Sequence, residues 1–251
     1  MLYHYCSAHA FKSIMDSKTI WLSDVGKSND PTESKALLLK GKETHVESQK
    51  EIDELIDVIN GFIVWAFCLS ENGDLLSQWR GYADDGKGFS IGFDENKIND
   101  SLFEPAYACG MELTKMKYSG EEKVHVGNSE EKLKTLIKSF YYKDSGFSEE
   151  KEQRLTIQCL IRDFFSSKMK DRLEYDNGVK NGTLNIAFNE NMVSHIEVPL
   201  ENLGNPISEI IIGPKNTTSI VDLKAFLFVN GYIESLEDDS IKIKKSKVAY
   251  R

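Results

Sequence analysis

The chain of 251 residues lacks the cysteine pairs, proline-rich runs and long apolar runs that would define several protein classes. Its four cysteines lie far apart and form no CxxC pair, which disfavours a zinc site. Its 17 glycines and 5 prolines show no period, so a collagen-like chain is excluded. The longest apolar run, residues 61–69, is far too short for a transmembrane helix. The N-terminus has no basic region of the kind that begins a signal peptide, so we expect a soluble cytoplasmic protein without metal, disulfide or membrane partner.

Net positive charge is also absent. The chain has 31 basic and 40 acidic residues, a formal net charge of −9. Nucleic acid would repel such a chain at long range, so any contact with it needs a local basic patch. The basic cluster in the sequence is C-terminal, and its pattern is typical of a solvated tail: Lys242, Lys244, Lys245, Lys247 and Arg251.

Common nucleotide motifs are missing as well. No GxxxxGK[ST] sequence is present, and no GxGxxG opens a helix. Phosphate-loop hydrolysis and Rossmann redox chemistry are therefore disfavoured. The spacing of serine, cysteine, histidine and aspartate assigns no catalytic triad.

The residues that are present predict an α+β fold of one domain, residues 1–251. Ser7 is a suitable N-cap for a helix that ends near Asp16. Another helix is expected at 221–229, and an amphipathic one at 49–60. Runs of β-forming residues predict strands at 2–6, 20–23, 62–69, 88–93, 172–175, 183–188, 195–200 and 207–212, with an edge strand within 241–250.

The middle of the sequence predicts a helical insertion at about 129–170. Leucine, isoleucine and phenylalanine share one helical face within 133–140. Ser148 is expected to cap a second helix, because acidic residues fill its first turn and an apolar stripe runs from Leu155 to Phe165.

The segment 67–93 carries the densest set of candidate binding residues. A buried strand leads into a short helix with Trp79, Arg80 and Tyr82, followed by a glycine-rich turn. Aromatic rings stack on a flat base and a guanidinium pairs with phosphate, so an aromatic, phosphate-bearing ligand fits. The alternative is that the turn joins a hairpin and the rings fill a core. His4 is a second candidate, with a buried structural histidine as the alternative.

Several segments together resemble one bacterial family, the domain-of-unknown-function family 2971. They run in order along nearly the whole chain: Leu2-Tyr-His-Tyr-Cys-Ser7, Ile20-Trp-Leu-Ser23, Asn29-Asp-Pro31 with Glu33, Phe67-Cys-Leu-Ser-Glu71, Leu76-Ser-Gln-Trp-Arg-Gly-Tyr-Ala-Asp84, 86–93, Ile210-Ile-Ile-Gly-Pro-Lys215 and Ser246-Lys-Val-Ala-Tyr-Arg251.

This family is remotely similar to ADP-ribosyltransferases, which implies a split, mixed β-sheet that holds NAD as a substrate, without a metal. The resemblance implies that His4 contacts the NAD ribose, that Tyr82 or Trp79 stacks on nicotinamide, and that Arg80 lies near the pyrophosphate. Ser23 is a further NAD-binding candidate on the same basis.

The resemblance also implies a catalytic glutamate. Phe147-Ser-Glu-Glu-Lys-Glu-Gln-Arg-Leu155 matches the family's Phe-x-x-Glu-x-Glu-x-Arg pattern and nominates Glu152, supported by Glu150 and Arg154. The resemblance requires a strand edge there, whereas the acidic run by itself favours a helix N-terminus. A rival match at 168–172 leaves only Glu174 nearby.

Three functions follow from the resemblance. The first is an NAD-dependent ADP-ribosyltransferase, a toxin or phage-defence effector that modifies a nucleic acid or a protein and that an antitoxin or sensor partner controls. The second is an NAD glycohydrolase, with water as the acceptor. The third is a non-catalytic module that senses NAD or ADP-ribose, which needs the stacking ring but not the glutamate.

Overall fold

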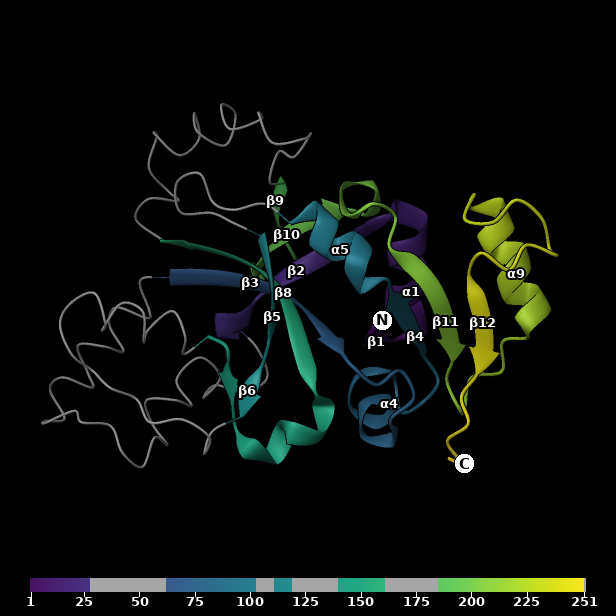
Figure 1. Cartoon of the computed structure of the whole chain (residues 1–251), viewed down its shortest axis with the longest axis horizontal. Helices are drawn as coiled ribbons and strands as arrows, with labels where there is room; N and C mark the ends of the chain where they lie inside the picture. Colours follow the sequence, from purple (N-terminus) through teal and green to yellow (C-terminus); the bar gives the residue numbers. More distant parts are fainter. Residues whose placement is uncertain (28–61, 103–110, 119–139, 161–184, 251) are drawn as a thin grey trace, which may run out of the picture. The chain divides into compact units, whose positions relative to one another are not determined.

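The structure is a computed structural model that describes residues 1–27, 62–102, 111–118, 140–160 and 185–250. It has the expected α+β composition, with a mostly antiparallel sheet and few helices (Figure 1). The chain divides into two compact units: Met1–Ile20, Cys68–Ser101 and Val198–Arg251 form unit 1, and Trp21–Phe67 and Leu102–Glu197 form unit 2. The prediction of a single domain stays a prediction.

Unit 1 is a sheet covered by helices. Its strands follow the order β12-β11-β4-β1, and β1 also pairs with the end of β3 at Tyr3 and Ser70. β12 runs parallel to β11, and the other pairs are antiparallel. Its elements are β1 (Leu2–Cys6), α1 (Ala8–Ser17), α4 (Leu76–Tyr82), β4 (Phe89–Phe93), α5 (Glu95–Ser101), η3 (Leu200–Leu203), β11 (Ile207–Ile212), α9 (Ile220–Val229) and β12 (Lys242–Lys245).

The two faces of this sheet carry different helices. Phe11 of α1 stacks on Phe89 of β4, with 4.1 Å between the ring centroids. Phe89 pairs with Cys6, so α1 covers the face to which Cys6 and His4 point, because alternate residues of a strand share a face. Tyr5 points to the other face, where it meets Trp79 of α4 in an edge-to-face contact at 4.9 Å.

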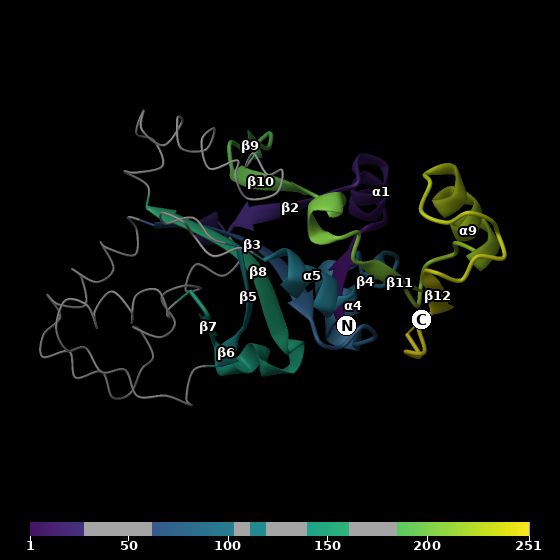
Figure 2. The ribbon, with the colours of Figure 1, turned by 45° about the horizontal axis from the view of Figure 1, so that its top comes forward.

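Local signals in the sequence set the helix ends of unit 1. The Oγ of Ser7 accepts a hydrogen bond from the backbone N–H of Ala10 at 3.1 Å, which confirms the predicted N-cap of α1. Lys18 ends this helix in the left-handed conformation, with φ 52°. α9 begins in the same manner, because Ser219 accepts from Asp222. Figure 2 shows α9 beside β12.

Unit 2 also contains a sheet, in the order β9-β10-β2-β3-β8-β5. A separate parallel pair joins β6 to β7. Its elements are β5 (Met111–Lys115), β6 (Lys117–Tyr118), β7 (Tyr142–Lys143), β8 (Glu152–Leu160), β9 (Asn185–Phe188) and the short 3₁₀ helices η1 (Val25–Lys27) and η2 (Ser145–Glu150). The strands β2 (Thr19–Asp24), β3 (Phe62–Ser70) and β10 (Ser194–Pro199) have residues in both units.

The helix expected from Ser148 to Phe165 is wrong over its described part. Asp144, not Ser148, caps the short helix η2, and Lys151 ends it with φ 43°. β8 then begins at Glu152. Of the acidic residues that suggested a helix N-terminus, Glu149 and Glu150 belong to η2 and Glu152 is the first residue of β8. Leu155 and Ile157 are buried in a strand that pairs with β5, so the helical insertion is not helical over residues 152–160.

Other sequence predictions fall outside the described residues. These are the helix at 49–60, the helix at 133–140 apart from Phe140, the strand at 172–175 and the rival position around Glu174. Among the residues that are described, no helix combines the length and the apolar character needed to cross a membrane.

Candidate functional site

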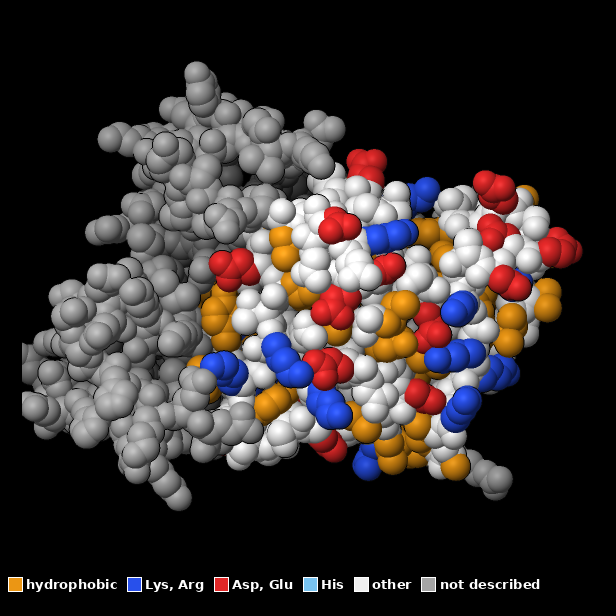
Figure 3. Space-filling model, in the orientation of Figure 1, with side chains coloured by type: hydrophobic (Ala, Val, Ile, Leu, Met, Phe, Trp, Pro, Cys, Tyr) orange, Lys and Arg blue, Asp and Glu red, His pale blue; other side chains and the backbone are white. Residues whose placement is uncertain are grey.

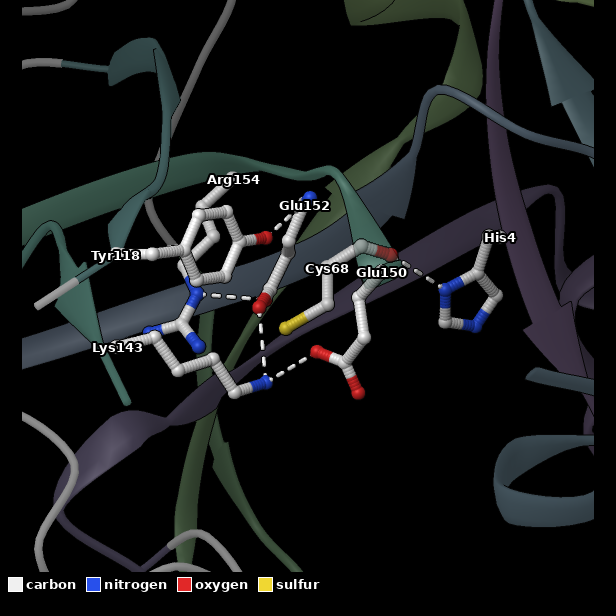
Figure 4. Close-up of polar contacts among 7 residues, drawn as sticks. All are labelled: His4, Cys68, Tyr118, Lys143, Glu150, Glu152 and Arg154. Atoms are coloured by element: carbon white, nitrogen blue, oxygen red, sulfur yellow. Dashed lines mark hydrogen bonds and ion pairs between the residues drawn. The ribbon is translucent and has the colours of Figure 1, made fainter. Parts of the chain in front are cut away.

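A buried ionic cluster lies at the start of β8 in unit 2 (Figure 4). The Nζ of Lys143 lies between two carboxylates, 2.6 Å from Oε2 of Glu150 and 3.0 Å from Oε2 of Glu152. The Nε of Arg154 donates to the other oxygen of Glu152 at 2.7 Å. We call these four residues the carboxylate cluster. Two positive and two negative groups make it neutral overall.

The cluster is shielded from water. Each of its four side chains is less than a tenth exposed. Burial alone lowers the pKa of Lys143, but the attraction of Glu152 and Glu150 outweighs that effect and raises this pKa above its ordinary value. The lysine is therefore charged at neutral pH.

Hydrogen bonds also fix the backbone of Glu152. Its N–H donates to the hydroxyl oxygen of Tyr118 at 2.9 Å, and its carbonyl accepts from the N–H of Met116 at 2.9 Å. Lys151 adopts a left-handed conformation between the two glutamates, so Glu150 ends the 3₁₀ turn and Glu152 opens the strand. This turn brings both carboxylates to one ammonium group and makes Glu152 the first residue of a strand rather than part of a helix N-terminus.

His4 belongs to unit 1 and makes a hydrogen bond there. Its Nδ1 lies 3.0 Å from the carbonyl oxygen of Cys68 (Figure 4). A carbonyl oxygen only accepts, so Nδ1 carries the proton and Nε2 of the neutral ring is an acceptor. Burial lowers the pKa of His4 to about 4, although the bond to Cys68 favours the charged form. The ring is therefore neutral at physiological pH.

The predicted residues of α4 do not gather around His4. Trp79 is fully buried in a cluster with Tyr5, and its indole N–H donates to Asp74 at 2.7 Å. Tyr82 is 47% exposed, but α4 covers the face of the sheet opposite to His4. The guanidinium carbon of Arg80 lies 6.0 Å from the ring centroid of Tyr250. The structure thus makes Trp79 a core residue and separates Tyr82 from His4.

The strand that carries Ser23 also carries one member of an aromatic pair that was not predicted from the sequence. Ser23 and Trp21 are exposed on β2, where they alternate with buried Ile20 and Leu22. The indole of Trp21, half exposed, stacks on the ring of His195 with 4.0 Å between centroids and 28° between planes. Both belong to unit 2. An exposed tryptophan on the polar face of an alternating strand was the signal available in the sequence.

The imidazole of His195 lies beneath this tryptophan, and its Nε2 makes no hydrogen bond to the described residues. The side chain is 5% exposed, and Nε2 itself is buried. Oε1 of Glu197 lies 3.8 Å from this nitrogen, which is beyond hydrogen-bond distance. We call these residues the Trp21–His195 stack. A half-exposed indole supported from below presents a rigid flat surface, which suits the stacking of a planar ligand ring.

No set of three or more histidine, cysteine, aspartate or glutamate residues in the described ranges is arranged to hold a metal ion. The side chains gathered at the candidate sites are carboxylates with cationic partners and an aromatic pair. They are suited to electrostatic stabilisation and to stacking.

The fold and these sites define an α+β protein with a mostly antiparallel sheet and a buried carboxylate pair at the start of a strand. A family model described as "Protein of unknown function (DUF2971)" matches residues 78–155, which include Trp79, Tyr82 and the whole carboxylate cluster. The match supports the family that the sequence motifs indicate. No curated protein and no solved structure matches the chain. The likeness to ADP-ribosyltransferases therefore stays a prediction.

Proposed function

We propose that the chain is an NAD-dependent ADP-ribosyltransferase, and that Glu152 is its catalytic carboxylate. The observation that carries this proposal is the carboxylate pair of Glu150, which ends η2, and Glu152, which opens β8. Lys143 fixes an oxygen of each, and Arg154 fixes the second oxygen of Glu152. Such chemistry needs a preorganised negative charge beside a carbon that becomes positive, in a site that excludes water. Glu152 is a carboxylate fixed in a dry environment, and Lys143 and Arg154 balance its charge until a positive ribose lies against it.

The proposed reaction exchanges one bond at the ribose. The bond between C1′ and the nicotinamide nitrogen breaks, and its electron pair leaves with neutral nicotinamide. Glu152 stabilises the positive charge that develops on the ribose. A nucleophilic oxygen or nitrogen of the acceptor then bonds to C1′, and its proton passes to Glu150 or to water. The alternative acceptor is water, which gives an NAD glycohydrolase.

The stacking role moves to Trp21 in this proposal. Trp79 has no exposed surface on which a ligand could stack, whereas half of Trp21 is exposed and its ring is supported by His195. Ser23 is exposed two residues along the same strand, within reach of a polar group on the same ligand.

The test is the release of nicotinamide from NAD, measured with purified protein in the presence and absence of cell lysate. Release that depends on lysate, with labelled ADP-ribose transferred to a lysate component, supports the transferase. Release in buffer alone, with free ADP-ribose as product, replaces it by the glycohydrolase. Glu152→Gln should lower the rate at least a hundredfold. The matched control is Glu149→Gln, because Glu149 is exposed in the same turn.

A second candidate is a non-catalytic module that binds NAD or ADP-ribose. One observation favours it: the carboxylate cluster is neutral and internally paired, as a purely structural cluster would be. Under this alternative NAD raises the melting temperature of the protein without any release of nicotinamide. A role as a toxin or phage-defence effector with an antitoxin or sensor partner belongs to the first proposal, and growth arrest on expression, abolished by Glu152→Gln, tests it.

A further inference from the structure

The C-terminal lysines of unit 1 are held in place by the fold. Three of them belong to β12, where Lys245 pairs with Ile212 of β11. The chain beyond the strand is then fastened: the N–H of Ser246 donates to the carbonyl of Ile212 at 2.8 Å, and the N–H of Lys247 donates to Oδ2 of Asp74 at 2.7 Å. The lysines are exposed, but residues 242–247 are not a free tail, and β12 confirms the edge strand predicted within 241–250.

Most of these lysines have no acidic partner. Lys244 pairs with Glu209 at 2.8 Å. In the part of the chain that the structure describes, no ion pair engages Lys242, Lys245 or Lys247, and all three are exposed. Figure 3 shows basic side chains gathered over β12. This concentration contrasts with the net charge of −9 of the whole chain.

Aromatic and cationic groups of α4 lie on the sheet face that the C-terminal segment crosses. Val248 packs against the core cluster of Tyr5 and Trp79, which brings this segment to α4. Arg80 is exposed near the ring of Tyr250. Tyr82, also exposed, ends the same helix. Lys242 and Lys245 are three residues apart in the edge strand β12 and point to opposite faces of the sheet, so the exposed lysines surround its edge. We call Arg80, Tyr82, Lys242, Lys245 and Lys247 the basic face.

We propose that the basic face binds single-stranded nucleic acid. Lysines that make no ion pair among the described residues can neutralise backbone phosphates, as can Arg80, and the exposed Tyr82 on the same helix as Arg80 can stack on a base. A fixed strand and anchored segment lose little conformational freedom on binding, unlike a free tail. An acidic protein partner would also pair with the lysines, but it has no base to stack on Tyr82. This inference concerns binding alone and does not depend on NAD chemistry; together with the proposed transferase it would make nucleic acid the acceptor class.

The test measures fluorescence anisotropy of a fluorescein-labelled 12-nucleotide uridine RNA between 50 and 200 mM salt. The triple variant Lys242→Gln, Lys245→Gln, Lys247→Gln is compared with a control triple at the exposed lysines 12, 27 and 97. Each triple removes three positive charges and changes the net charge from −9 to −12. The face triple should weaken binding at least tenfold, and the logarithmic salt slope should become shallower by about 2, since each lost phosphate contact on a single strand contributes about 0.7. The RNA affinity of the control triple should stay within twofold of that of the wild-type protein.

Three results would overturn the inference: no RNA binding by the wild-type protein, equal loss in both triples, or equally effective competition by polyglutamate or by phosphatidylserine vesicles. If the wild-type protein binds no RNA, the lysines serve only to prevent a strand of another chain from pairing with the exposed edge strand β12. Tyr82→Ala should weaken RNA binding at least fivefold while leaving polyglutamate unaffected. The anisotropy assay contains no NAD, so its result does not depend on the transferase. RNA binding by a protein that releases no nicotinamide in the separate assay with NAD and lysate would refute the transferase and leave this inference intact.

Discussion

The indole nitrogen of Trp79 donates to Oδ1 of Asp74 at 2.7 Å, and this bond connects α4 to the end of the chain. The same oxygen accepts from the hydroxyl of Ser246 at 2.5 Å, and the second oxygen accepts from the N–H of Lys247. One carboxylate therefore satisfies a buried tryptophan and fastens the segment that follows β12. This explains why Trp79 is a structural residue.

Replacement of Asp74 by alanine should lower the free energy of unfolding by about 2–4 kcal/mol. The substitution leaves the buried indole N–H without an acceptor and releases two contacts of the C-terminal segment, and an unsatisfied buried donor costs about 1–3 kcal/mol. Urea unfolding followed by circular dichroism measures the change. Asp100→Ala, at an exposed position of α5, should change the free energy by less than about 0.5 kcal/mol. Equal effects of the two substitutions would contradict the fastening role.

Several strands and helix ends could be predicted because their signals are local. Alternation of buried and exposed residues in 20–23, the apolar run before Ser70 and the Ser7 cap all concern neighbours in the chain. The role of Asp74 could not be predicted, because its bond to Ser246 joins residues 172 positions apart. The same holds for the Trp21–His195 stack. β8 was misread for a different reason: an acidic run before apolar residues is compatible with both a helix N-terminus and a 3₁₀ turn that enters a strand.

Loss of Lys143 should destabilise the protein strongly. Lys143→Met removes the positive group shared by Glu150 and Glu152 and leaves negative charge uncompensated in a buried site, at a cost of about 3–5 kcal/mol. Lys151→Met, at an exposed position of the adjoining turn, is the matched control and should be nearly neutral.

The stabilisation by Lys143 should also depend on pH. Its pKa is raised in the folded protein, so its contribution is complete below the ordinary value of 10.5 and declines as pH rises beyond that value. The difference in unfolding free energy between wild type and Lys143→Met should therefore be constant from pH 7 to 10 and shrink at higher pH. A difference that grows above pH 10.5 would refute the ionic role.

Protonation of His4 should lower the free energy of unfolding in mild acid. Its pKa is about 4 in the folded protein against an ordinary 6.5, so the unfolded chain takes up a proton first as pH falls. Stability is unaffected by this group above pH 6.5 and decreases between pH 6.5 and 4, by up to about 3 kcal/mol. Unfolding of wild type and His4→Gln in urea across this range should show a flatter profile for the variant. His9→Gln, an exposed histidine of α1, should keep the wild-type slope.

The fluorescence of Trp21 should report ligand binding, because the three tryptophans differ in exposure. Trp65 and Trp79 are fully buried, whereas Trp21 is 50% exposed and stacked on His195. If a planar ring of NAD stacks on the outer face of Trp21, titration with NAD should change the fluorescence of this exposed tryptophan. Trp21→Phe keeps a stacking ring and should weaken NAD binding less than fivefold, whereas Trp21→Ala should weaken it at least tenfold.

The control for Trp21 is another exposed aromatic residue of unit 2. Phe188 of β9 is 56% exposed, and Phe188→Ala removes a comparable ring without touching the stack. NAD affinity measured by calorimetry should be unchanged in this variant. Because Trp21 points to the exposed face of its strand, Trp21→Ala should preserve the melting temperature within a few degrees, which separates a binding defect from a folding defect. Equal NAD affinity in wild type and Trp21→Ala would remove Trp21 from the site and return the stacking role to Tyr82, whose substitution by alanine would then have to lower the affinity.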